Sequence, residues 1–423
     1  MPTYRENSRK IQKKGNSAVM KELLNMPEVG RALEYIKADD ERTLKEQLEM
    51  CVIPAPSHDE KEKAEYVLAK FKEIGLEQVY MDDIYNVYGT IPGSGNGPRL
   101  MLAAHTDTVF PRETDLTIRK EGERYYCPGI NDDTRSVAEL LTIARAMKEY
   151  DIRPEGELVF CANVCEEGLG DLKGVKYIFN TEHYDGFVSI DNPVPGGIVY
   201  TATGSHRFRV TFKGDGGHSF GAFGTPSAIH ALGRAISKIA DFQVPKLPKT
   251  TFNVGIIEGG ISVNTIAASA SMLVDIRPDS PEELERLTKE LYDVVQCAQD
   301  EENARGYEGR LPVHFEIDML GKRPAGTQPE DCTIVRAAWE ATEALGMKAE
   351  LRDESSTDAN IPISLGIPAI TIGRGGEGKE EHTVHEWFEP KDAYLAPQRT
   401  LITMLALSGY KGYHAYQLPI IEG

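Results

Sequence analysis

The stretch Leu100-Met101-Leu102-Ala103-Ala104-His105-Thr106-Asp107 indicates how the rest of this chain folds. Its five successive apolar residues predict a strand buried on both faces, as in a parallel α/β sheet. His105 follows these residues, and Asp107 comes two positions later. A histidine at the end of a buried strand is well placed to bind a metal ion, and a nearby carboxylate can orient its ring. A His–Asp pair that only satisfies its own hydrogen bonds is the alternative, so the partners further along the chain decide.

Further carboxylates share this placement. Five of them stand where an apolar strand or a helix is predicted to begin or end: Asp107, Asp132, Glu166, Glu167 and Asp191. In open α/β sheets the binding site lies outside the carboxyl ends of the strands, so these groups are expected near His105. Clustered carboxylates repel one another unless cations lie among them, which favours a metal centre. Two alternatives remain open: Asp132 or Asp133 caps the helix that follows, or Glu166-Glu167 is a solvated acidic loop.

Composition restricts the class of protein. The chain has 423 residues, which is long for one core and predicts two domains. Its 47 basic and 66 acidic residues give a net charge of −19, which argues against a nucleic-acid partner or an acidic membrane surface. The six cysteines have no disulfide-scaffold spacing, as expected in the cytoplasm, and buried free thiols are the first interpretation of Cys161 and Cys165. Residues 1–20 are polar and basic, with no signal peptide, and no apolar run is long enough to span a membrane.

The pattern changes at Ser205. Alternating apolar residues predict a strand there, and the sequence then predicts a helix at Pro226–Ala240 and strands at Thr251–Ile257 and Ile266–Ile276. A helix that opens at Ser280-Pro281 and a strand at Val313–Ile317 complete a β-α-β-β-α-β order, which is typical of a ferredoxin-like unit. We therefore predict a small α+β domain at 204–320, inserted into a larger α/β domain made of 1–203 and 321–423.

Two further local patterns concern loops of the larger domain. Ser57 with Glu60 predicts a capping box for a helix that Gly75 ends. The loop Gly373–Lys379 has the spacing of a phosphate-binding P-loop, but Glu380 stands where a P-loop needs Ser or Thr, and no clear helix follows. A nucleotide-binding protein is therefore an unfavoured alternative.

Taken together, the motifs resemble one family. They appear in the order of the M20 metallopeptidases, with the peptidase T (tripeptide aminopeptidase) branch most similar: His105-Thr106-Asp107, Asn131-Asp132-Asp133, Glu166-Glu167-Gly168, Asp191, Gly217-His218-Ser219, Asp275-Ile276-Arg277 and His382-x-x-x-Glu386. The resemblance covers nearly the whole chain. It implies a zinc-exopeptidase-like α/β/α catalytic domain, with the inserted domain acting in dimerisation and as a lid.

The resemblance also implies a centre of two zinc ions, with Co²⁺ or Mn²⁺ as possible substitutes. Asp132 would bridge the ions, His105 and Asp191 would complete one position, and Glu167 and His382 the other. These residue types suit zinc, which takes histidine nitrogen and carboxylate oxygen and lowers the pKa of bound water towards ~7. His385 competes with His382 as a ligand, although the spacing to Glu386 favours His382.

The remaining roles follow from the same resemblance. Asp107 would orient His105, and Glu166 would be the general base. In a homodimer His218 would reach the partner's site and stabilise the oxyanion, while Asn264 and Arg277 would hold the substrate; a turn histidine and a surface charge are the plain alternatives for His218 and Arg277. The predicted activity is hydrolysis of short peptides, as by a tripeptidase or aminopeptidase. An N-acyl-amino-acid amidohydrolase, a carboxypeptidase, or a non-catalytic binding relative are the alternatives.

Overall fold

The computed structural model describes residues 17–352 and 355–421, so most of the basic N-terminal segment lies outside the described residues. The chain divides into two compact units, Met1–Thr201 with Gln328–Gly423, and Ala202–Thr327. In the part that is described, no helix has both the length and the apolar character needed to cross a membrane.

A large mixed sheet organises the first unit. Its centre is β3 (Leu100–His105), in which all six residues are buried. β3 pairs in parallel with β6 (Leu158–Asn163) and β7 (Gly186–Asn192), as its apolar sequence predicts. The full order is β1-β2-β6-β3-β7-β16-β8-β15. The other strands are β1 (Glu77–Met81), β2 (Val87–Ile91), β8 (Gly197–Val199), β15 (Glu350–Arg352) and β16 (Ala369–Gly373).

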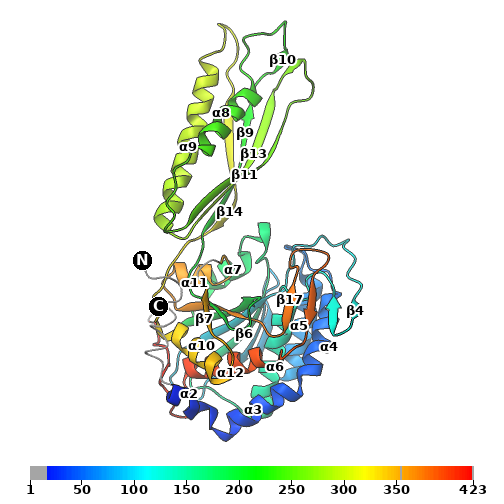
Figure 1. Cartoon of the computed structure of the whole chain (residues 1–423), viewed down its shortest axis with the longest axis vertical. Helices are drawn as coiled ribbons and strands as arrows, with labels where there is room; N and C mark the ends of the chain where they lie inside the picture. The colour runs from blue at the N-terminus through cyan, green and yellow to red at the C-terminus, as the bar shows by residue number, and fades with distance from the viewer. Residues whose placement is uncertain (1–16, 353–354, 422–423) are drawn as a thin grey trace. The chain divides into compact units, whose positions relative to one another are not determined.

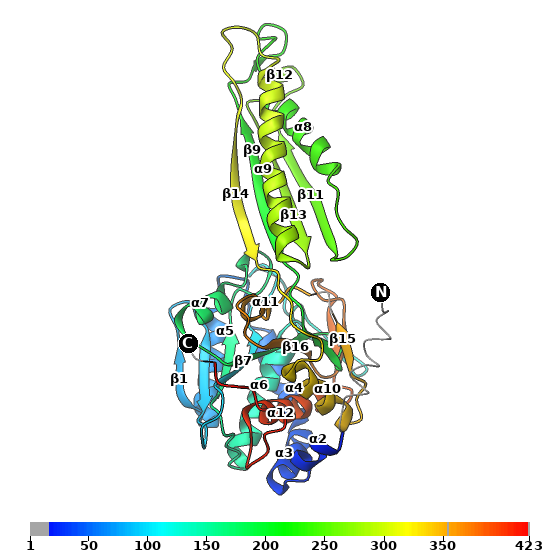
Figure 2. The ribbon, with the colours of Figure 1, turned by 90° about the vertical axis from the view of Figure 1, so that its left-hand side faces the viewer.

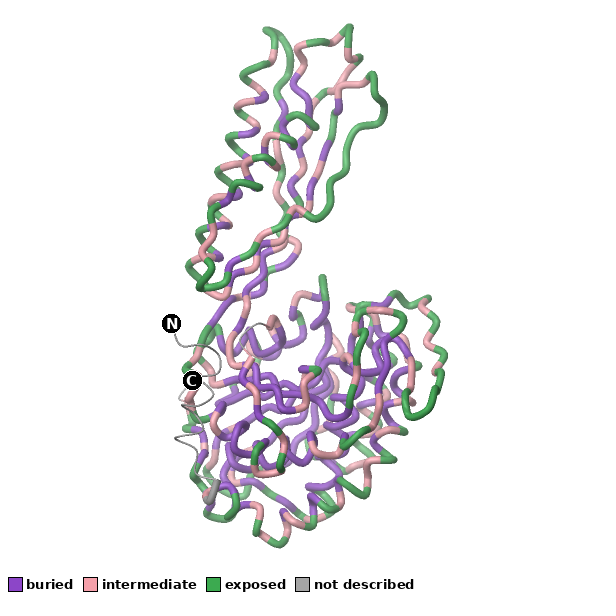
Figure 3. The backbone as a smooth tube through the Cα atoms, viewed as in Figure 1, coloured by how far each residue is buried: buried purple, intermediate pink, exposed green. Residues whose placement is uncertain are grey.

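Helices cover both faces of this sheet (Figures 1 and 2). One face carries α6 (Thr134–Glu149), α10 (Thr333–Ala344) and α12 (Leu395–Ser408), and the other carries α7 (Lys173–Thr181) and α11 (Asn360–Ser364). Figure 3 shows that buried residues gather in the sheet and its inner helices. All residues of α6 from Thr134 to Met147 are buried, so this helix lies inside the unit rather than on its surface.

Further elements complete the first unit. Its N-terminal helices are α2 (Ser17–Leu24), α3 (Pro27–Ala38), α4 (Asp40–Cys51) and α5 (Lys61–Ile74). A short 3-10 turn, η1, spans Gly168–Gly170. A separate four-stranded sheet has the order β17-β18-β5-β4. Its strands are β17 (Glu377–Lys379), β18 (Trp387–Glu389), β5 (Arg124–Tyr126) and β4 (Arg119–Glu121).

The start of α5 differs from the prediction. Gly75 ends the helix with φ 81°, as expected for a left-handed C-terminal residue. The predicted capping box is wrong, however, because Ser57 lies outside the helix and donates to Asp107 Oδ2 (2.6 Å). Glu60 accepts instead from the backbone N–H groups of His58 and Cys165, both at 3.0 Å. The pair therefore ties this loop to the end of β6 rather than capping a helix.

The second unit is the predicted ferredoxin-like fold. Its antiparallel sheet has the order β11-β13-β9-β14. The strands are β9 (Ser205–Lys213), β11 (Thr250–Gly259), β13 (Ser269–Pro278) and β14 (His314–Arg323). The helices α8 (Ala228–Ala240) and α9 (Pro281–Asn303) pack on one face, and Ser280 caps α9 by accepting from the Glu283 N–H. A two-residue ladder joins β10 (Gly217–His218) to β12 (Thr265–Ile266).

Two predicted bounds in this unit need correction. The strand expected at 266–276 is two strands, β12 and β13. β14 extends to Arg323, so the end of the inserted domain predicted at residue 320 falls inside a strand.

Candidate metal centre

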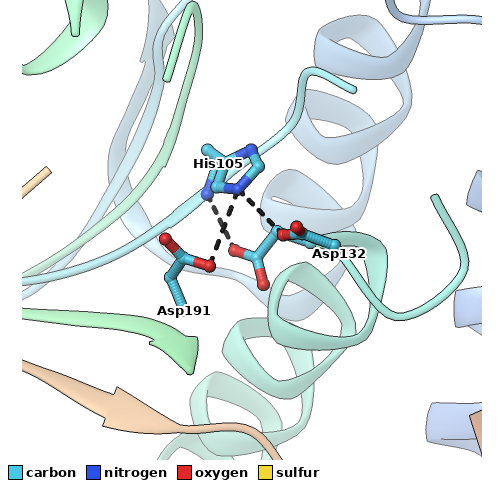
Figure 4. Close-up of side chains that lie close together, drawn as sticks. His105, Asp132 and Asp191 are labelled. Carbon is cyan, nitrogen blue, oxygen red and sulfur yellow. Dashed lines mark hydrogen bonds and ion pairs between the residues drawn. The ribbon is translucent and has the colours of Figure 1, made fainter. Parts of the chain in front are cut away.

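The carboxyl edge of the central sheet brings one histidine and two aspartates together. His105 is the last residue of β3, Asp191 lies near the end of β7, and Asp132 lies in the loop before α6. Figure 4 shows the three side chains pointing toward one another. His105 Nε2 lies 3.4 Å from Asp132 Oδ1 and 3.8 Å from Asp191 Oδ1. Such spacings suit ligands around one zinc ion, whose bonds to nitrogen and oxygen are about 2.0–2.2 Å.

A second group of donors uses the other oxygen of the same aspartate. His382 Nε2 lies 3.2 Å from Asp132 Oδ2 and 2.8 Å from Glu167 Oε1. These hydrogen bonds raise the pKa of His382 to about 11. Asp132 thus offers one oxygen to each group, as a carboxylate that bridges two ions would. A third set of donors within 4.8 Å joins His105 to Glu166 and Glu167.

His385 lies outside these groups, whereas Asp133 belongs to the first one, with His105, Asp132 and Asp191. The structure brings His382 to the carboxylates, whereas His385 is exposed and donates its backbone N–H to the Thr383 hydroxyl (3.1 Å). Among the described residues no cysteine belongs to a candidate metal group. Asp133 precedes α6 but makes no side-chain cap. Its carboxylate accepts instead from the His105 backbone N–H (3.1 Å), so the predicted capping role does not hold for it.

The adjacent glutamates reach the site because the chain leaves β6. Cys165 and Gly168 both have positive φ, 57° and 48°, so Glu166 and Glu167 lie in a turn rather than on alternate faces of a strand. Asp107 holds this turn by accepting from the two glutamate N–H groups at 2.9 and 3.0 Å. Both glutamates are buried, which is not the solvated loop of the alternative interpretation.

Asp107 contacts the histidine through two atoms. Its backbone carbonyl lies 3.0 Å from His105 Nδ1, and its carboxylate Oδ1 lies 3.4 Å away. The Ser57 hydroxyl holds the other carboxylate oxygen. Asp107 is therefore the point at which β3, the 166–167 turn and the loop before α5 meet. Nothing in the local sequence around Ser57 indicated this contact, because it joins residues 50 positions apart.

Glu386 anchors the loop that carries Asp132. Its carboxylate accepts from three backbone N–H groups, those of Gly129, Asn131 and Asp132, at 2.8–2.9 Å. Burial and the neighbouring Asp132 charge raise the pKa of Glu386 to about 7. The spacing from His382 singled out Glu386 in the sequence. It did not indicate that Glu386 holds the loop with Asp132.

Arg374 is a buried residue of the site that the sequence did not reveal. It follows β16, is only 2% exposed, and directs its guanidinium at the carboxylates of the centre. Burial alone would lower the pKa of Arg374, but Asp132 and the other surrounding carboxylates hold it well above its usual value. The only signal in the sequence was a glycine-rich loop with P-loop spacing. The structure also argues against the unfavoured P-loop alternative, because this loop ends in β17, whereas a P-loop leads into a helix N-terminus.

The predicted substrate residues lie in the second unit. His218 is exposed, and its Nδ1 lies 3.2–3.3 Å from the backbone N–H groups of Phe220 and Gly221. The β10–β12 ladder pairs it with Thr265, next to Asn264, whose carbonyl accepts from the Ser219 N–H (2.9 Å). Arg277 lies on β13 and pairs with Asp275 (2.7 Å). The roles of all three residues stay predictions.

Comparison with known proteins identifies the family. The sequence profile described as Peptidase family M20/M25/M40 matches residues 101–406, which span both units. The chain belongs to this family. It is a hydrolytic enzyme, and zinc dependence is characteristic of the family.

Individual relatives are distant. An uncharacterised protein of Bacillus subtilis is 27% identical over 367 residues, 82% of this chain and 93% of that protein. Succinyl-diaminopimelate desuccinylase of Corynebacterium glutamicum is 25% identical over 336 residues, 76% of this chain and 85% of that enzyme. The solved structure of a tripeptidase from Staphylococcus aureus has a TM-score of 0.73 and 23% identity, and the match covers 86% of this chain and 98% of that one. The last similarity confirms the fold, whereas the substrate differs among such relatives.

Proposed function

We propose that this member of the M20 family is an exopeptidase that hydrolyses short peptides, as a tripeptidase or aminopeptidase does, with two zinc ions. The observation that carries the proposal is the pair of donor groups that share Asp132. His105 and Asp191 complete one position, and Glu167 and His382 the other. The mixture of imidazole nitrogen and carboxylate oxygen fits zinc, and it would also accept Co²⁺ or Mn²⁺.

When bound here, the ions supply Lewis-acid polarisation of the scissile carbonyl and make a bound water more acidic. The protein's own part is proton transfer and orientation. Glu166 takes a proton from the attacking water and returns it to the leaving amine. Its burial at the 166–167 turn and the contact of that turn with Asp107 support this role, because a general base must be held within reach of its proton. Asp107 also fixes the ring of His105.

The second unit supplies the rest of the site in this proposal. The chain forms a homodimer in which His218 serves the neighbouring subunit's centre and stabilises the oxyanion, while Asn264 and Arg277 hold carbonyl or carboxylate groups of the substrate. The edge strand β11 supports the proposal of a dimer. Its Ile256 and Ile257 are 51% and 63% exposed, and a second subunit that pairs with this edge would cover them.

A substrate screen tests the proposed specificity. Zinc-loaded protein is given a tripeptide with a free amino terminus, the same peptide with a blocked amino terminus, and N-succinyl and N-acetyl amino acids. Release of the first residue from the free tripeptide alone supports the proposal. Preference for the N-acyl compounds supports the amidohydrolase alternative, which the desuccinylase relative favours. Release of the carboxyl-terminal residue from both peptides supports a carboxypeptidase, and no hydrolysis of any of them would indicate a non-catalytic relative.

A further inference from the structure

A buried arginine lies among the proposed metal ligands. Arg374 Nη1 lies 3.2 Å from an oxygen of Asp133, 3.2 Å from one of Asp191 and 3.5 Å from one of Asp132. The other terminal nitrogen, Nη2, pairs with Glu381. The backbone N–H of Arg374 donates to the Asn192 carbonyl (3.0 Å), at the end of β7. The backbone of Arg374 is therefore fixed at the end of β7, and its guanidinium is fixed by the surrounding carboxylates.

The arginine does not face the two donor groups equally. The oxygens it contacts on Asp132 and Asp191 are both Oδ1, the same atoms that lie nearest to His105 Nε2. The other group uses Asp132 Oδ2, Glu167 and His382. Within the described ranges, Arg374 has no ion pair with Glu167, and its hydrogen bond to Asp132 goes to Oδ1.

This asymmetry has an electrostatic consequence. An arginine stays protonated in proteins, so its charge is a fixed feature of the site. A cation bound beside His105 has to share two carboxylate oxygens with the guanidinium and is repelled by its charge at short range. A cation bound beside His382 shares no oxygen with it. In the absence of ions, the guanidinium offsets the mutual repulsion of Asp132, Asp133 and Asp191.

We propose that Arg374 makes the two metal positions unequal. The ion held by His105 and Asp191 binds at least tenfold more weakly than the ion held by Glu167 and His382, and Arg374 is the positioning residue that causes the difference. The inference rests on the proposed two-ion centre. It adds that, as zinc is supplied, the position held by Glu167 and His382 is occupied before the position held by His105 and Asp191.

Zinc titration of metal-stripped protein against a competing chromophoric chelator tests this inference. Wild-type protein should bind two ions in steps that differ at least tenfold in affinity. Replacing the guanidinium with an uncharged chain of similar length, R374M, should tighten the weaker step at least tenfold and leave the tighter step within about threefold. R374K, which keeps the charge, should retain the separation. Equal steps in wild type, or a weaker step that loosens in R374M, would overturn the inference.

Two ligand variants assign the steps and keep the test decisive if R374M fails to fold. D191N should lose the weak step and keep the tight one, and H382A should lose the tight step. The opposite pattern would contradict the assignment. Thermal unfolding gives an independent readout: without zinc R374M should melt below wild type, and zinc should raise its melting temperature by more than it raises that of wild type. If wild type binds no zinc at all, the proposed function fails, whereas two equal ions would reject only the role of Arg374.

Discussion

Glu166 is the residue whose role is most sharply separable from metal binding. Both Glu166 and Glu167 are buried and form a donor set with His105, yet only Glu167 also lies in the group with Asp132 and His382. Changing Glu166 to glutamine removes a base while keeping shape, so turnover should fall by about 10²–10⁴-fold. The number of zinc ions bound per chain should stay the same. E167Q is the matched control, because it should weaken zinc binding. Steady-state kinetics with metal analysis checks both, and near-normal turnover in E166Q would refute the base assignment.

His382 links metal binding to pH. Without metal its pKa is raised to about 11 by hydrogen bonds to Asp132 and Glu167, so the ring is charged at neutral pH. The stabilisation from these contacts is therefore fully present below pH ~6.5, the usual histidine pKa, and is lost as pH rises through the raised pKa. Zinc needs the neutral ring, so binding should release at least one proton and tighten as pH rises. Calorimetry in buffers of different ionisation enthalpy measures this release. H382A should release fewer protons than wild type, and equal release would contradict the explanation.

At the scale of elements, the loop before α6 depends on an anchor from a distant segment. Glu386 accepts three backbone hydrogen bonds there, and the loop carries Asp132. E386Q leaves part of this buried set unpaired, so the free energy of unfolding should fall by roughly 1–3 kcal/mol. Zinc affinity should fall as well, because Asp132 serves both positions. Urea unfolding and zinc titration measure the two effects.

The matched control is E389Q on β18, which loses only a partly exposed ion pair with Arg124 and should change stability by less than about 1 kcal/mol. An E386Q protein with wild-type zinc affinity would show that the anchor does not position the ligand.

The buried apolar strands of the central sheet were predictable from sequence, and so were the residues at their ends. β3, β6 and β7 are short runs of buried residues, and a polar group that ends such a run is placed by the sheet itself. The six-element order of the second unit was equally clear, because each strand or helix keeps its own apolar period over several residues. The sheet therefore fixes the fold and the positions of His105 and Asp191, whereas Asp132, Glu167 and His382 lie on loops.

Other features could not be read from local pattern. β4, β5, β8, β15, β17 and β18 have three residues each, too few to show a period. Ser57 and Glu60 predicted a capping box, because Ser and Glu side chains that cap a helix can equally hold a loop, and Ser57 instead donates to Asp107. Arg374 lay in a polar loop, where an arginine is normally solvated, and only the packing of β16 beside β7 turns it toward the carboxylates.

At the scale of the whole molecule, the proposed homodimer makes a prediction about mixed subunits. H218A should be inactive because the oxyanion donor is lost, and E166Q because the base is lost. If His218 serves the neighbouring subunit, a mixed dimer has one site with both residues intact. Activity should then return to at most half of the wild-type value per dimer after subunit exchange.

Size-exclusion chromatography and a tagged pull-down verify that both variants fold and that mixed dimers form. H218A mixed with H218A is the control and should stay inactive. A verified mixed dimer without recovered activity would place His218 in its own subunit's site or outside catalysis.

The most direct test of the central claim counts the ions that activity needs. Metal-stripped protein is titrated with zinc while bound metal and hydrolysis of a free tripeptide are followed in the same samples. We predict no hydrolysis without metal, and activity that reaches its maximum at two ions per chain. D132N, which removes the shared ligand, should not reach that activity at any zinc concentration. Full activity with one ion per chain, or two bound ions without hydrolysis of any peptide or N-acyl amino acid, would contradict the account.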